Sequence, residues 1–96
     1  MWQELPGATA KTQAVGVASV VIATENPRRA KLIICNAGVV DCYLARINGA
    51  TLNSGILLLA NGGTIIDEPD TLGRIYTGVW SAISSGAGTT LSISEE

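Results

Sequence analysis

The stretch LIICNAGVVDCYLA, residues 32–45, contains two short apolar segments separated by an Asn-Ala-Gly turn. The first segment, Ala30–Asn36, is almost continuously apolar and too short for a typical helix, which favours a strand buried on both faces. In the second segment, Val40–Ala45, apolar and more polar side chains alternate, as they do in a half-buried strand. Because asparagine and glycine favour tight turns, the sequence predicts that these two strands form a hairpin.

The same pattern continues in both directions from this stretch. Segments rich in β-branched residues predict further strands at Gln13–Ala23, Ile56–Ala60, Thr64–Ile66, Arg74–Ser84 and Thr89–Ser94. The segment Arg74–Ser84 is either one long strand or two shorter ones. Ile56–Ala60 is expected to pair with Thr64–Ile66 across Asn61-Gly62-Gly63, and the last two strands are expected to be joined by a hairpin loop at residues 85–88.

These short strands predict the fold class. Turn residues recur about every 8–12 residues, and no apolar stripe follows the spacing of a helix. We therefore predict an all-β fold, a single small antiparallel β-sandwich or jelly-roll-like barrel of about seven to eight short strands.

The N-terminus differs from the rest of the chain because it shows no apolar period. Residues 1–12 are expected to form an extended arm, and residues 13–96 the β-sandwich domain. Trp2 and Leu5 are the bulky apolar side chains of this arm, so both are candidate contacts with a neighbouring subunit. The N-terminus resembles no signal peptide and no segment is long enough to span a membrane, which predicts synthesis in a cytoplasm and no membrane partner.

The composition argues against several classes of function. The chain of 96 residues has no histidine, which removes the commonest general base and metal ligand. We therefore expect no enzyme, no catalytic residue, no cofactor and no metal site. The net charge of −2 argues against a nucleic-acid partner. Cys35 and Cys42 lack the spacing of a zinc site and are expected to be free, buried thiols.

Charged residues make up only 15% of the chain, below the roughly 25% usual in soluble domains. Either a partner covers part of the surface, or serine, threonine, asparagine and glycine provide a neutral polar surface. The charges that are present form a basic and an acidic cluster, which are either solvated turns or complementary contacts between subunits. The candidate assembly contacts, together with the arm residues, are Arg28, Arg29, Arg46, Asp67, Glu68, Asp70 and Trp80.

Turn and strand motifs along residues 13–95 resemble those of small β-sandwich virion proteins of tailed bacteriophages. These motifs are Asn26-Pro27-Arg28-Arg29, Asn36, Asp41 with Tyr43-Leu44, Ser54-Gly55-Ile56, Gly62-Gly63, Tyr76-Thr77-Gly78 and Thr89–Glu95. The resemblance implies a capsid cement or decoration protein, a head fibre or a tail accessory protein. It also implies a virion location and a homo-oligomer, such as a trimer, that contacts major capsid or tail proteins.

A second hypothesis is a carbohydrate-binding module for host attachment. The rings of Tyr43, Tyr76 and Trp80 would then stack on sugars, whereas in a structural protein Trp80 would lie in the core or in an interface.

Overall fold

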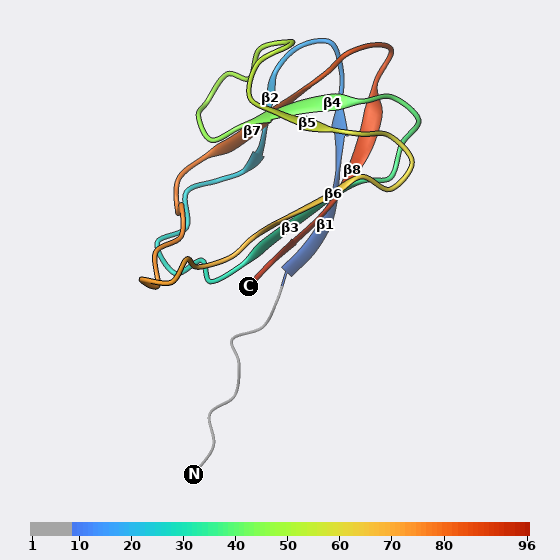
Figure 1. Cartoon of the computed structure of the whole chain (residues 1–96). Helices are drawn as coiled ribbons and strands as arrows, with labels where there is room; N and C mark the ends of the chain where they lie inside the picture. Colours follow the sequence, from blue (N-terminus) through green and yellow to red (C-terminus); the bar gives the residue numbers. More distant parts are fainter. Residues whose placement is uncertain (1–8) are drawn as a thin grey trace.

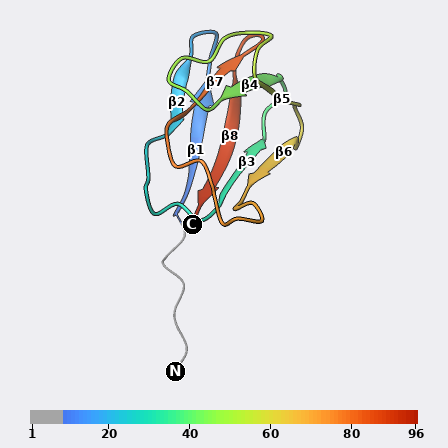
Figure 2. The same cartoon turned by 60° about the vertical axis from the view of Figure 1, so that its left-hand side comes forward.

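The computed structural model describes residues 9–96, which form eight β-strands and no helix. The strands are β1 Thr9–Val15, β2 Val20–Ala23, β3 Leu32–Asn36, β4 Cys42–Ala45, β5 Ile56–Leu58, β6 Thr64–Asp67, β7 Trp80–Ser84 and β8 Thr89–Glu95. They build two antiparallel four-stranded sheets, sheet A in the order β1-β8-β3-β6 and sheet B in the order β2-β7-β4-β5 (Figure 1, Figure 2). The predicted all-β sandwich is confirmed.

The strand pairing follows the order of a folded ribbon. Strand β1 pairs with β8, β2 with β7, β3 with β6 and β4 with β5, so the chain doubles back once, at the loop between β4 and β5. Pairing of β3 with β8 and of β4 with β7 then joins the ribbon into two sheets. This is the strand order of a jelly roll, in which two Greek keys form a double sheet.

The three predicted hairpins are wrong, and the hydrogen bonds between the connections show why. Strands β3 and β4 lie in different sheets, and so do β5 and β6 and also β7 and β8. At the β5–β6 connection, the amides of Asn61 and Gly62 donate to the carbonyls of Gly38 and Asn36 in the β3–β4 connection. An apolar pattern shows which face of a strand is buried, but it does not show in which sheet the strand lies.

The N-terminal boundaries also differ from the prediction. Residues 9–12, expected in the arm, belong to β1 and pair with β8. The single strand expected at residues 13–23 is divided into β1 and β2, which lie in different sheets on either side of residues 16–19. Because Val15, Val17, Val20 and Val21 follow one another closely, the apolar pattern of the sequence continues across a change of sheet.

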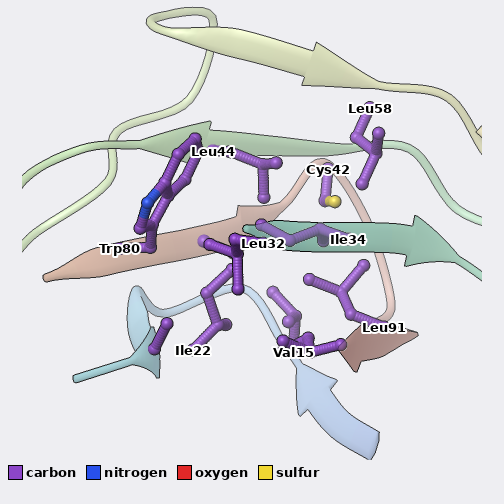
Figure 3. Packing of buried hydrophobic residues seen from close by; sticks show 12 residues of the cluster. Val15, Ile22, Leu32, Ile34, Cys42, Leu44, Leu58, Trp80 and Leu91 are labelled. Atoms are coloured by element: carbon purple, nitrogen blue, oxygen red, sulfur yellow. The ribbon is translucent and has the colours of Figure 1, made fainter. Parts of the chain in front are cut away.

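The core lies between the sheets (Figure 3). Trp80 and Leu44 from sheet B are fully buried, and Leu32 and Ile34 from sheet A face them. Burial alternates along β3, so this strand is buried on one face and not on both as predicted.

Asn36 is a fully buried polar residue that connects the two sheets at one end of the sandwich. Its Nδ2 donates to the carbonyls of Val40, at 2.8 Å, and of Leu58 in sheet B, at 3.2 Å. Its Oδ1 accepts from the Thr89 hydroxyl, at 2.6 Å, and from the Gly38 amide, at 3.1 Å. One side chain therefore satisfies four buried or partly buried groups on three segments of the chain, the β3–β4 connection, β5 and β8.

We expect Asn36→Leu to lower the free energy of unfolding by about 2–4 kcal/mol, because four buried or partly buried polar groups lose their partner. Urea denaturation followed by circular dichroism measures this effect. Asn48→Leu, at an exposed position, is the matched control and should change the free energy by less than about 0.5 kcal/mol. Equal midpoints for the two variants would contradict the role of Asn36.

Candidate assembly surface

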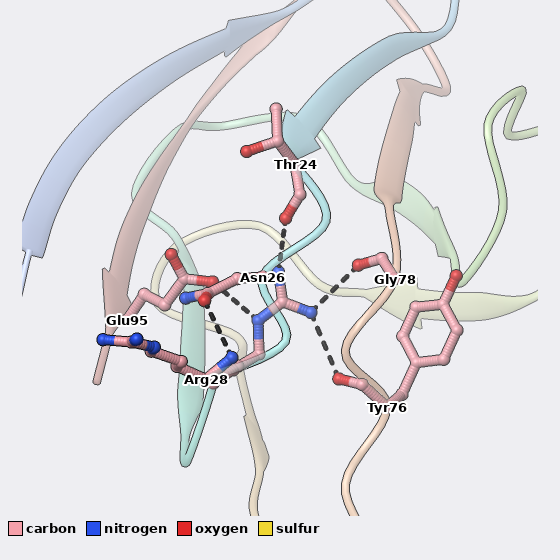
Figure 4. A network of polar contacts seen from close by, with 7 residues as sticks. Thr24, Asn26, Arg28, Tyr76, Gly78 and Glu95 are labelled. Atoms are coloured by element: carbon pink, nitrogen blue, oxygen red, sulfur yellow. Dashed lines mark hydrogen bonds and ion pairs between the residues drawn. The ribbon is translucent and has the colours of Figure 1, made fainter.

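Arg29 holds the opposite end of the sandwich, where the β2–β3 and β6–β7 connections meet. Its Nε donates to the Glu95 carboxylate at 2.6 Å, and Nη2 donates to the carbonyl of Thr24 at 2.8 Å. Its Nη1 donates to the carbonyls of Tyr76 and Gly78, at 3.1 and 2.9 Å. Figure 4 shows these three carbonyl groups converging on the guanidinium group. The charge is thereby paired and its donors are directed to the backbone.

The two neighbouring arginines predicted as assembly contacts have different environments. The Arg29 side chain is 0% exposed, so that it cannot contact another subunit. Arg28 is exposed, and its amide donates to Asn26 Oδ1 in the local turn. The prediction is therefore wrong for Arg29, because its side chain is directed inward toward Glu95 and three backbone carbonyls.

Arg29→Met should lower the free energy of unfolding by about 3 kcal/mol or more, since Glu95 and three carbonyls lose a buried partner. Arg28→Met removes the same charge from an exposed position and should change stability by less than about 0.5 kcal/mol. Chemical denaturation of both variants checks this difference. A loss shared equally by the two would show that net charge, and not the buried network, causes it.

Three other predicted contacts, Arg46, Asp67 and Trp80, lie together at this same end. Arg46 Nη2 donates to Asp67 Oδ1 at 3.1 Å, and the guanidinium group lies 5.2 Å from the centre of the Trp80 ring. The hydroxyl of Tyr76 donates to the Arg46 carbonyl at 2.6 Å. A half-exposed arginine thus covers a buried carboxylate and a buried indole.

This cluster is mainly a packing arrangement within one chain. Trp80 is fully buried, which excludes its ring from contact with a sugar or a neighbouring subunit. Asp67 is also buried, so both predictions of direct contact are wrong. Asp67 Oδ2 and Trp80 Nε1 have no hydrogen-bond partner among the described residues. Of these three residues, only Arg46 presents its side chain to the surface.

The remaining predicted contacts have simple environments. Glu68 and Asp70 are exposed in the β6–β7 connection. Asp70 accepts from the amides of Leu72 and Arg74 and pairs with the Arg74 guanidinium. The hydrogen bond from the Arg74 amide is the main cause of a lowered pKa at Asp70. Trp2 and Leu5 lie outside the described residues.

The charged residues are concentrated at one end of the molecule. Within residues 9–96, every charged residue except Lys11 and Asp41 lies in the β2–β3 or β6–β7 connection, at Arg46, at the end of β6 or at the C-terminus. These segments are joined by the ion pairs of Arg29 and Arg46 and by a backbone bond from Asn26 to Thr77. The rest of the described surface therefore carries few charged residues, Lys11 and Asp41.

The outer face of sheet A is one of the uncharged surfaces. The strand register defines two full rows across the four strands and a shorter third row. The rows are Ala10-Ser94-Ile33-Ile66, Thr12-Ser92-Cys35-Thr64 and Ala14-Thr90. We call these ten residues the sheet A face. Exposure of Thr12, Ser92 and Ile66 shows that it is open in the described chain.

The outer face of sheet B is also uncharged, but the β4–β5 loop covers part of it. Ser81, on the outward side of β7, is 0% exposed because its hydroxyl donates to the Ile47 carbonyl in this loop. The hydroxyl of Tyr43 likewise donates to Asn53, and Ala50 is buried. The β4–β5 loop therefore covers part of the outer face of sheet B, while Leu57 on β5 remains 47% exposed there.

The sequence patterns predicted the strands of the sheet A face but not its importance. Seven of its ten residues are serine, threonine or alanine, and the other three are Ile33, Cys35 and Ile66. Each of them taken alone is an ordinary outward residue of a strand. The signal that identifies the face is collective, because no outward position on four adjacent strands carries the lysine, arginine or glutamate usual on an exposed sheet.

Both cysteines are free. Cys42 is in the core, where burial, with a smaller effect of the Asp41 charge, raises the pKa of its thiol to about 11. Cys35 is half-buried on the sheet A face, so the expectation of two buried thiols holds fully only for Cys42.

We expect dilute native protein at pH 8 to react with maleimide at Cys35 and not at Cys42, because the Cys42 thiol is buried and protonated. Mass spectrometry should find one label per native chain and two after denaturation in urea. Equal labelling of both thiols in the native protein would contradict this placement.

No protein family, no curated protein and no solved structure matches this chain. Residues 9–96 contain no group of three histidine, cysteine, aspartate or glutamate side chains arranged to hold a metal ion. The described chain also has no helix of the length and apolarity needed to cross a membrane.

Proposed function

We propose that this chain is a structural virion protein of a tailed bacteriophage, a capsid cement or decoration protein, head fibre or tail accessory protein that acts by assembly and without catalysis. The observation that carries the proposal is the open, uncharged sheet A face. A surface of this kind is suited to burial against another protein, since few charges must be desolvated when it is covered.

The distribution of charge supports the same function. Buried interfaces are depleted in charged residues at their centre, whereas charged groups at the rim steer association and fix orientation. Arg28, Glu68 and Asp70 remain exposed at the charged end and are available for such rim contacts. The motif resemblance to phage virion proteins adds the location, with the protein itself and major capsid or tail proteins as partners.

The carbohydrate-binding hypothesis finds no support in the described aromatic rings. Trp80 is buried, and the hydroxyl groups of Tyr43 and Tyr76 are engaged within the chain. None of these three side chains presents an exposed platform on which a sugar ring would stack.

The proposal predicts that phage particles produced from the genome that encodes this chain contain it in many copies. Quantitative mass spectrometry of particles purified on a density gradient measures the copy number against the major capsid protein. Labelling of the same particles with an antibody and electron microscopy then locates the protein on the head, neck or tail. Absence from particles, with the protein remaining in the lysate, would contradict the proposal.

A further inference from the structure

We infer that the sheet A face is the site at which a second copy of this chain binds, with the two copies related by a twofold axis. This inference rests on the proposed function, because it names the partner that the assembly surface contacts first. It is argued from the charge, the side-chain sizes and the dimensions of the face.

Because the sheet A face carries no charged side chain, two copies of it can meet without repulsion between like charges. When two identical surfaces meet, each charged group near the axis approaches a like charge, which opposes association. The rows of the sheet A face bring no such group together. The charged residues of the four strands, Lys11, Asp67 and Glu95, belong to the rows that face the other way. Lys11 pairs with the buried Ile93 and lines a cavity of about 200 Å³ between β1 and β2, and Asp67 and Glu95 both pair with the buried Leu32.

Side-chain size differs between the two halves of the face. The half formed by β1 and β8 contains only alanine, serine and threonine, whereas the half formed by β3 and β6 contains Ile33, Ile66, Cys35 and Thr64. A twofold axis that runs along the strands, between β8 and β3, places the larger half of each copy on the smaller half of the other. The face is therefore complementary to itself in the way that an isologous interface requires.

The contact between the two copies would be that of two sheets packed face to face. Two sheets packed face to face align their strands within about 30° and lie about 10 Å apart. Small residues at Ser92 and Thr12 permit the close approach of the second sheet. Ile66, which is 53% exposed in one chain, would be removed from water in the pair, with a favourable contribution from its apolar surface.

The dimensions of the face limit the strength of the pair. Four strands about 4.8 Å apart present a width of roughly 15–20 Å, which corresponds to an interface at or below about 1,200 Å² in total. Such an interface associates reversibly, so we expect a monomer–dimer equilibrium with a dissociation constant on the order of 10–100 µM.

Sedimentation velocity of the full chain over a concentration series tests the inference. The wild-type chain should shift from monomer to dimer, and Ser92→Arg should stay monomeric because it places an unpaired charge at the centre of the interface. Leu72→Arg adds the same charge at a residue that is 73% exposed at the charged end and should dimerise like the wild type. A wild-type monomer at every concentration, a trimer, or dimerisation of Ser92→Arg would overturn it.

Cys35 provides a second measurement that does not depend on a variant. In the wild-type chain, its reaction with maleimide should slow at least several-fold as the protein concentration rises through the dissociation constant. An unchanged rate would overturn the inference even if Ser92→Arg failed to fold. Presence of the protein in particles together with an unprotected Cys35 would leave the virion function in place and reject only the twofold pair.

Discussion

The fold depends on contacts that join the two sheets at their ends. Its strands pair as β1 with β8, β2 with β7, β3 with β6 and β4 with β5, so the connections between paired strands must be fixed on both sides of the sandwich. The ladder of backbone hydrogen bonds within each sheet does not cross the gap between the sheets. Single backbone bonds between connections, such as that from Asn26 to Thr77, act together with two buried polar side chains. Arg29 joins the connections at one end to β8, and Asn36 joins β3 to β5 and to the start of β8 at the other end.

The interactions that stabilise the fold therefore do not lie on the outer face of sheet A. The Arg29 network and the core around Trp80 lie inside the chain, and the exposed charges gather around the Arg29 end. Ion pairs across the outer face are therefore not needed to hold the strands of sheet A together. That face retains neutral side chains, most of them short, which water solvates in a single copy and which another protein can cover with a small desolvation penalty.

The sequence patterns predicted the strand positions well because burial follows a period of two, as along β4 and β8. They did not predict the topology, since an Asn-Gly-Gly turn is compatible both with a hairpin and with a connection between sheets. Arg29 and Trp80 were assigned to contacts between subunits for a related reason. Residue type shows that an arginine needs partners, but only the fold shows that Glu95 and three carbonyls of the same chain provide them.

The central claim is that this fold presents one uncharged sheet face for burial against another protein. An electron cryomicroscopy reconstruction of the assembled form, at a resolution that shows side chains, tests it most directly. We predict that protein density covers Cys35, Ser92 and Ile66. An assembly in which these three side chains face solvent, with all contacts made by the charged end, would contradict the account.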